Sequence, residues 1–181
     1  MRGKVNLMGH GVHPMLIVFP LALLTLTPIT DIVRLVTRNS FWSHVSFFLA
    51  FAGVVAGVVA AIPGFLDWLT IPRGTRARRV GVTHLTVNLI GLALFTISIV
   101  LRMRVGAERF APVAFLLAAA GAATLVVGGW FGGELVERLS VGVWSDAHLE
   151  APSSLDAVTL MRRPGDGARP HPGPPTEPRP A

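Results

Sequence analysis

Four long apolar segments constrain this chain more than any other feature of its sequence. They cover about residues 14–36, 41–66, 80–101 and 112–131, and each reaches the ~20 residues needed to cross ~30 Å of hydrocarbon. Because lipid cannot satisfy backbone N–H and C=O groups, each segment is expected to form a helix. The sequence therefore predicts an all-α fold: a four-helix transmembrane bundle that runs up-down-up-down.

The composition agrees with a lipid-facing surface. Only 14% of the 181 residues are charged, against about 25% in soluble domains, which is too few to cover a surface in water. The absence of cysteine excludes disulfides, thiolate metal ligands, cysteine nucleophiles and covalently attached c-type haem. The net charge of +6 comes mainly from arginines in short loops and in the tail. This pattern suits phospholipid headgroups, and we expect no nucleic-acid partner.

The chain divides by composition into a transmembrane domain, residues 1–150, and a tail, residues 151–181. The tail is rich in proline and glycine and has no apolar periodicity. It buries too little apolar surface to offset the entropy of ordering, so a disordered tail is predicted. The first segment is interrupted by Pro20 and Pro28 and lacks a clean cleavage site, so it is interpreted as a retained helix rather than a secretory signal.

The start of the first segment is unusual, because Gly-His-Gly-Val-His-Pro precedes the apolar run. Pro14 suits a first helical turn, which makes His13 the predicted N-cap. Pro20 and Pro28 predict a kink at one or both positions. Asp31 lies ~25 Å along the helix from Pro14, close to the far interface, where pairing with the nearby Arg34 is expected.

A polar cluster is predicted at one membrane face. Because successive spans alternate in direction, the starts of the first and third spans share a face with the ends of the second and fourth. This places His13, Asp67, His84 and Glu134 at a common level. Asn88 follows His84 by one helical turn and shares its face of the helix, and a polar stripe on an apolar helix is expected to face the interior of the bundle.

The chemical hypothesis drawn from this cluster is a b-type haem ligated axially by His13 and His84. Haem iron accepts imidazole from facing helices of a bundle, and Asp67 or Asn88 would orient a ring nitrogen. The glycine-rich fourth span would leave room for a flat ring. A divalent metal on His13 and His84, joined by His10 and Asp67, is the alternative ligand. His44 lies at the opposite face, without a histidine partner.

Three functions follow from these interpretations. The first is a small electron-transfer subunit of the membrane that uses His13 and His84 and is not an enzyme on its own. The second is a non-catalytic scaffold or interaction protein, in which His13 caps its helix and His84 bonds to Asp67. The third is transport of a small solute, a proton or a metal, although the ionisable groups lie at the rims of the spans. The small-residue patterns Gly53-x-x-x-Gly57 and 128–133 predict close helix packing and leave a homodimer open.

The location is predicted from the charges of the loops. The loop before the third span carries four arginines on the same side as the N-terminus: Arg73, Arg76, Arg78 and Arg79. Basic loops stay on the cytoplasmic side. We therefore expect a multi-pass protein of the cytoplasmic (inner) membrane with both termini in the cytoplasm.

A set of short motifs in order resembles a known family. They are His13-Pro14 with Phe19-Pro20, Pro63-Gly64 to Asp67-Trp68, His84 with Asn88, and Gly132-Gly133-Glu134-Leu135-Val136 to Gly142-Val143. Together, over about residues 10 to 143, they resemble the bacterial membrane family catalogued as domain of unknown function 2231. Glu137-Arg138 stands where that family often has an aromatic residue.

The resemblance implies a bacterial membrane protein but no assigned activity. Some members of the family are joined to Rieske-type iron–sulfur domains, which implies redox work at the membrane. This chain has no cysteine to ligate such a cluster, so a Rieske-type partner would be a separate protein.

Overall fold

The structure is a computed structural model of the whole chain, and it describes residues 4–106, 108–145, 147–151 and 153–154. The chain divides into two compact units, residues 1–147 and residues 148–181. In the second unit the Ala151 N–H donates to the His148 carbonyl at 3.0 Å. The predicted disordered tail falls almost entirely outside the described residues, so the fold below is that of the first unit.

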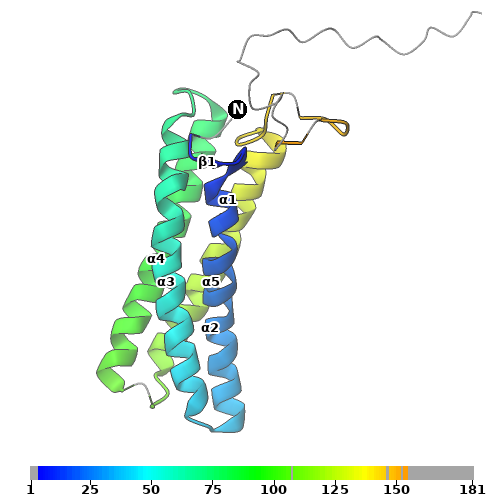
Figure 1. The fold of residues 1–181 in the computed structure, drawn as a ribbon. Coiled ribbons are helices and arrows are strands. Elements are labelled where there is room, and N and C mark those ends of the chain that lie inside the picture. Colours follow the sequence, from blue (N-terminus) through cyan, green and yellow to red (C-terminus); the bar gives the residue numbers. More distant parts are fainter. Residues whose placement is uncertain (1–3, 107, 146, 152, 155–181) are drawn as a thin grey trace, which may run out of the picture. The chain divides into compact units, whose positions relative to one another are not determined.

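The first unit is a bundle of long helices with a small β-hairpin at its start (Figure 1). Within the described residues, four spans are long and apolar enough to cross a membrane. This confirms the predicted all-α four-helix bundle. The elements in order are β1 (Asn6–Leu7), β2 (His10–Gly11), α1 (Val12–Leu16), α2 (Val18–Thr37), α3 (Phe41–Leu69), α4 (Arg76–Val105), α5 (Pro112–Gly133) and the π-helical η1 (Glu134–Arg138).

The first span is broken between α1 and α2, at Ile17. Pro20 has no N–H to donate to the carbonyl four residues before it, and its ring crowds that carbonyl. This confirms the kink expected from the prolines, since it lies one turn before Pro20, whereas Pro28 stays within α2. The predicted N-cap was wrong by two residues: Gly11 caps α1 and His13 lies inside it. The His13 side chain is therefore free to reach a neighbouring helix.

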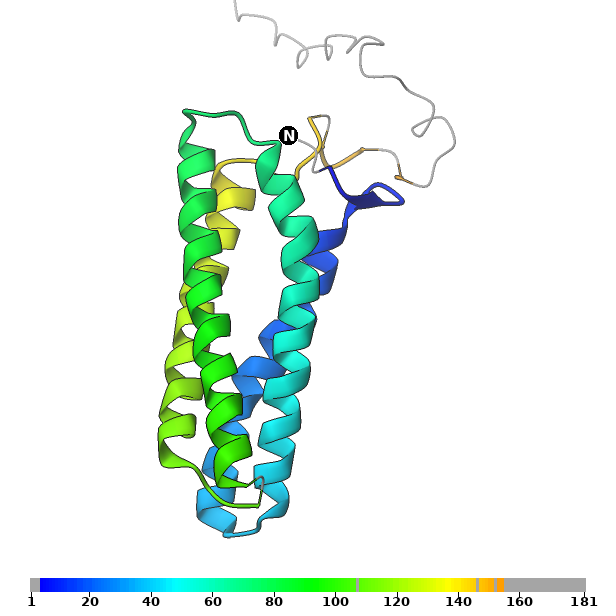
Figure 2. The same cartoon turned by 90° about the vertical axis from the view of Figure 1, so that its left-hand side faces the viewer.

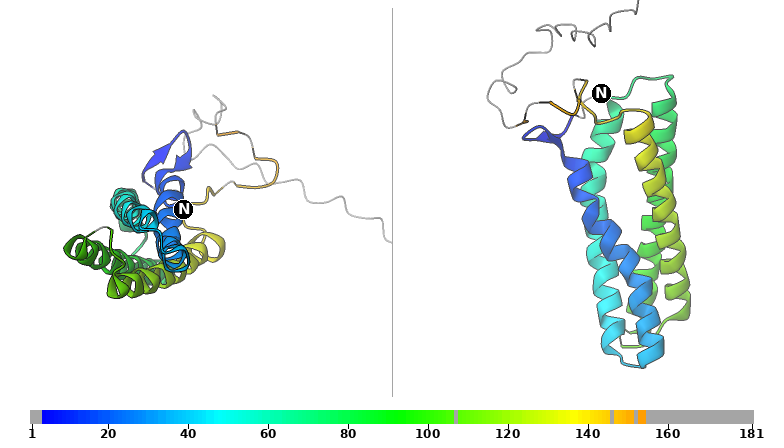
Figure 3. Two further views of the ribbon diagram at one scale, coloured as in Figure 1. Left: turned by 90° about the horizontal axis from the view of Figure 1, so that it is seen from below. Right: turned by 90° about the vertical axis from the view of Figure 1, so that its right-hand side faces the viewer.

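The spans associate as two antiparallel pairs, α2 with α3 and α4 with α5. Figure 3 shows α1 and α2 leaning across α3, and Figure 2 shows α3 and α4 diverging toward the end that carries α1. We call the half of the bundle beside α1 the open half, and the half beside the loops at 38–40 and 106–111 the closed half.

Close packing in the bundle depends on glycine. A Cβ at Gly53 would lie 2.5 Å from a methyl of Leu24, and a Cβ at Gly57 would lie 2.7 Å from a methyl of Leu92. The small-residue pattern of α3 therefore packs against neighbours in the same chain.

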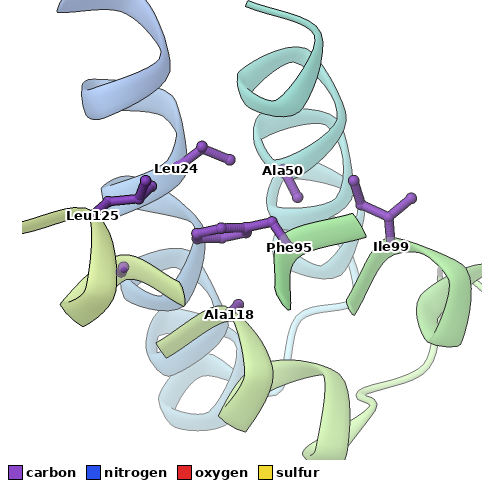
Figure 4. Packing of buried hydrophobic residues seen from close by; sticks show 7 residues of the cluster. Leu24, Ala50, Phe95, Ile99, Ala118 and Leu125 are labelled. Atoms are coloured by element: carbon purple, nitrogen blue, oxygen red, sulfur yellow. The ribbon is translucent and has the colours of Figure 1, made fainter. Parts of the chain in front are cut away.

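The closed half contains the apolar core. The Phe95 ring is fully buried and lies among side chains of α2, α3 and α5 and beside Ile99 of its own helix (Figure 4). These core residues are Leu24, Ala50, Ile99, Ala118, Ala122 and Leu125. Alanines beside one phenylalanine bring the four helices close enough to exclude any sizeable space here.

A buried ion pair also joins the two helix pairs in the closed half. Arg102 of α4 donates to both carboxylate oxygens of Asp31 of α2, at 2.9 and 2.5 Å, and the two side chains are only 6% and 1% exposed. The predicted pairing of Asp31 with Arg34 was wrong, because Arg34 instead donates to Ser43. A bidentate guanidinium satisfies a carboxylate that lipid cannot solvate, which a single interfacial contact would not do.

Candidate functional site

A cavity of about 390 Å³ lies between the two helix pairs in the open half. Most of its wall is apolar, and Leu24, Leu92 and Leu125 line it where it meets the core. The polar side chains on its wall belong to His13, Asp67, Thr70, His84 and Asn88. Four of these five are the predicted site residues, so the fold brings them to one apolar space.

His13 reaches the cavity wall from α1. Its Nδ1 lies 2.8 Å from the carbonyl oxygen of Ala60 on α3, and because a carbonyl only accepts, Nδ1 carries the hydrogen. A Cβ at Gly64 would lie 2.7 Å from the same Nδ1. The glycine of the Pro63-Gly64 motif therefore makes room for this imidazole.

His84 is held in the same way from the other helix pair. Its Nδ1 lies 2.9 Å from the carbonyl oxygen of Gly128 on α5, so this Nδ1 also carries the hydrogen. A Cβ at Gly132 would come within 3.2 Å of the ring. The histidines thus stand in matching arrangements, each with a backbone carbonyl on Nδ1 and a glycine behind the ring.

The two imidazoles face each other across the helix pairs. Their ring centroids are 6.3 Å apart and their planes are nearly perpendicular, at 88°. Because the hydrogen is on Nδ1 in both rings, Nε2 carries the free lone pair in both. The predicted meeting of His13 and His84 is therefore present in the structure.

Of the two residues expected to orient a ring nitrogen, only Asn88 lies beside one, with its Nδ2 3.4 Å from His84 Nδ1. Asp67 Oδ1 accepts the Val5 N–H at 3.0 Å, and Asn88 Nδ2 donates to the backbone carbonyl of His84 at 2.7 Å. The expected His84–Asp67 bond of the scaffold interpretation is likewise replaced by the bond from His84 to Gly128. Backbone carbonyls take the orienting role because α3 and α5 approach the rings closely at glycine.

The remaining candidates lie away from the ring pair. His10 is exposed, with Nδ1 3.3 Å from the Met8 carbonyl, and Glu134 pairs with Arg76 at 2.5 Å. His44 is exposed and bonded to the Ser40 carbonyl of its own helix. Across the described residues, no group of three or more histidine and acidic side chains is placed to hold a metal ion. The four-ligand metal set that would join His10 and Asp67 to the two histidines is not assembled.

Glycines on α5 form part of the cavity wall. A Cβ at Gly128 would lie 2.6 Å from Asn88 Nδ2, whereas a Cβ at Gly129 would meet nothing within 4 Å. Gly129, Gly132 and Gly133 all line the cavity. Gly128 and Gly132 therefore make room for Asn88 and His84 of α4. Gly129 and Gly133 leave the neighbouring part of the cavity wall without side chains.

Two features of the site's surroundings had no expectation from the sequence. Trp144 Nε1 donates to the Gly9 carbonyl at 3.0 Å, which connects the end of the domain to its start. The guanidinium of Arg78 lies over the Trp68 ring, 3.7 Å from its centroid, and donates to the Trp68 and Leu69 carbonyls at the end of α3. A tryptophan and an arginine next to helix ends were the available signals, but a sequence does not say which carbonyl each one meets.

The fold and the site define a class: a four-span α-helical membrane protein with an apolar cavity and a facing histidine pair near one end of the bundle. The sequence model of the family described as "Predicted membrane protein (DUF2231)" matches residues 9–145. The chain therefore belongs to this family, as its motifs suggested. Comparison with curated proteins and with solved structures found no match.

Proposed function

We propose that the protein binds one b-type haem between His13 and His84 and serves as an electron-transfer subunit in the membrane. The observation that carries the proposal is the 6.3 Å separation of the two ring centroids. A metal–imidazole bond is ~2.1 Å and a ring nitrogen lies ~1.1 Å from its centroid, so axial imidazoles on one metal have centroids ~6.4 Å apart.

The hydrogen bonds of the two rings support the same function. Metal-ligating histidines generally donate their other ring N–H to a carbonyl or carboxylate, which fixes the tautomer and the direction of the lone pair. The Ala60 and Gly128 carbonyls meet both Nδ1 atoms in this way. The ligand set also suits haem better than a lone divalent ion, since two imidazoles without a third protein ligand complete the axial positions of a macrocycle.

The cavity supplies the other requirements of a haem protein. Its wall is mostly apolar, and burial in apolar surroundings is one way in which a protein sets a haem potential. Haem, when bound, would supply a one-electron redox centre. The chain's own contribution would be to hold two imidazoles at fixed spacing and orientation.

The test is the absorption spectrum of detergent-purified protein, with metal analysis of the same sample. We expect a Soret band and a six-coordinate low-spin spectrum. Substituting His13→Ala or His84→Ala should remove the low-spin signature, and the double variant should lose haem. The matched controls are His10→Ala and His44→Ala, which change exposed histidines away from the cavity and should leave the spectrum unchanged. A folded wild-type protein that stays colourless after haem is supplied would contradict the proposal.

A scaffold without a cofactor is the second candidate. The specific observation in its favour is that both Nδ1 atoms already bond to carbonyls of neighbouring helices, which would stabilise the open half without any ligand. Under this function the histidine variants lose stability but no colour is ever present. Transport has less support, because the buried charged pair of Asp31 and Arg102 lies in the packed half.

The setting of the function is also part of the proposal. An electron-transfer subunit with one cofactor near one face needs a separate redox partner on that face, for which a Rieske-type iron–sulfur protein is a candidate. The proposed location is the cytoplasmic membrane, with both termini in the cytoplasm. A homodimer is proposed only at the lipid-facing helix surfaces, since the small-residue rows of α3 and α5 largely pack within the chain. Reporter fusions at both termini test the orientation.

A further inference from the structure

The two histidines of the ring pair are supported unequally. His84 lies inside the continuous 30-residue helix α4. His13 lies in α1, a helix of five residues at the start of the first span. α1 is joined to α2 through Ile17, whose N–H donates to the His13 carbonyl and whose carbonyl accepts the Leu21 N–H. A short helix at the end of a span has few backbone bonds of its own to hold it. The position of His13 therefore depends on what contacts α1 from outside.

One outside contact is with α3, through the bond from His13 Nδ1 to the Ala60 carbonyl. The others come through what we call the N-terminal latch, residues 5–11, which includes β1 and β2. The Val12 N–H, at the start of α1, donates to the Val5 carbonyl at 3.1 Å. Two hydrogen bonds hold the latch to the rest of the domain. Asp67 Oδ1 accepts the Val5 N–H at 3.0 Å, and Trp144 Nε1 donates to the Gly9 carbonyl at 3.0 Å.

We infer that His13 is the displaceable ligand of the pair, so that a small neutral diatomic molecule binds in its place. This inference rests on the proposed function, because it takes haem as the group between the rings. In the exchange, the bond from iron to His13 Nε2 breaks and a bond from iron to the diatomic ligand forms, and no electron is transferred. Asp67 and Trp144 are positioning residues, which act on the exchange through the latch and α1.

The surroundings of His13 permit such a movement. Pro20 has no N–H to donate to the Leu16 carbonyl, so the backbone hydrogen bonding between α1 and α2 is incomplete, and α1 is expected to tilt about Ile17 without unfolding the longer helix. The two rings have matching hydrogen bonds and glycine neighbours, but His84 lies inside the continuous helix α4, which has no such break beside it. Exchange is therefore expected on the His13 side alone.

The experiment measures carbon monoxide binding to the reduced, haem-loaded protein. In the wild type the rate should level off at high carbon monoxide, because release of His13 limits it. Asp67→Ala and Trp144→Phe should each raise the limiting rate about fivefold, the effect of losing one hydrogen bond. Asp67→Asn keeps an acceptor oxygen for Val5 and should behave as wild type. His13→Ala should bind in proportion to carbon monoxide concentration, without a plateau.

A second measurement does not need haem. In haem-free protein, Asp67→Ala and Trp144→Phe should raise the amide hydrogen exchange of α1 about fivefold, whereas Asp67→Asn should not. Equal carbon monoxide rates in all variants, or a plateau that is abolished by His84→Ala rather than His13→Ala, would overturn the inference while haem binding stands. Unchanged exchange in α1 would overturn the positioning roles. Wild-type protein that binds no haem would overturn the proposed function, and the ligand exchange with it.

Discussion

The two halves of this bundle solve the problem of polar groups in lipid in opposite ways. In the closed half, two full charges are buried as an ion pair. Arg102 donates two hydrogen bonds to the carboxylate of Asp31. In the open half, the facing polar groups are two half-buried imidazoles, each bonded through one nitrogen to a backbone carbonyl. The closed half leaves the ion pair nothing further to bind, whereas the open half leaves one free nitrogen on each ring beside a cavity. The difference indicates which half holds the bundle together and which half is the candidate for binding a ligand.

The largest expected effect comes from breaking the ion pair. Arg102→Ala leaves the Asp31 carboxylate buried without a partner, and the expected loss is about 3–5 kcal/mol in the free energy of unfolding. Thermal or denaturant unfolding in detergent measures it, with Arg104→Ala on the exposed side of the same helix as the control. The double variant Asp31→Leu with Arg102→Met removes both charges and should recover most of the loss. A loss as small as that of Arg104→Ala would mean that the pair does not hold the two helix pairs together.

A smaller effect is expected from filling the glycine row of the open half. A Cβ at Gly128 would overlap the amide of Asn88 at 2.6 Å, and overpacking of this kind costs about 1–3 kcal/mol. Gly129→Ala is the matched control. It makes the same glycine-to-alanine gain in helix propensity, but at a position where the added Cβ has no atom within 4 Å. The unfolding free energies of the two variants should differ by that cost. Equal behaviour of the two variants would show that the row does not set the position of His84.

The smallest effect is expected from the ion pair at the surface of the open half. Arg76 and Glu134 pair at 2.5 Å, but the arginine side chain is 58% exposed. Exposed pairs contribute about 0.2–1 kcal/mol and weaken with salt. A double-mutant cycle of Arg76→Ala and Glu134→Ala, repeated at low and high salt, should give a coupling energy in that range. A coupling comparable to that of Asp31 with Arg102 would remove the contrast between exposed and buried pairs.

The sequence was sufficient for the spans and for the level of the site. Apolar length predicts four helices, and alternation of direction places His13 and His84 at one end, because both inferences need only the pattern along the chain. The structure extends the third span by four residues at its start, to Arg76. Arginines at a helix start are not apolar, so a hydropathy pattern ends before the helix does.

The partners of the polar side chains could not be predicted in the same way. Asp31 pairs across the bundle with Arg102, 71 residues away, whereas the sequence favoured its neighbour Arg34. Which carbonyls meet the imidazoles depends on how closely α3 and α5 approach, and this is set by glycines whose facing direction a sequence does not give. Helix rotation, rather than helix position, was therefore the missing information.

The most direct test of the central claim is a titration of haem into the purified, haem-free protein, followed by absorbance. The claim is that the open half is built to hold two imidazoles on one iron. It predicts binding of one haem per chain with a six-coordinate low-spin spectrum, and loss of that spectrum in the His13→Ala and His84→Ala double variant. A folded wild-type protein that binds haem no better than the double variant would contradict it.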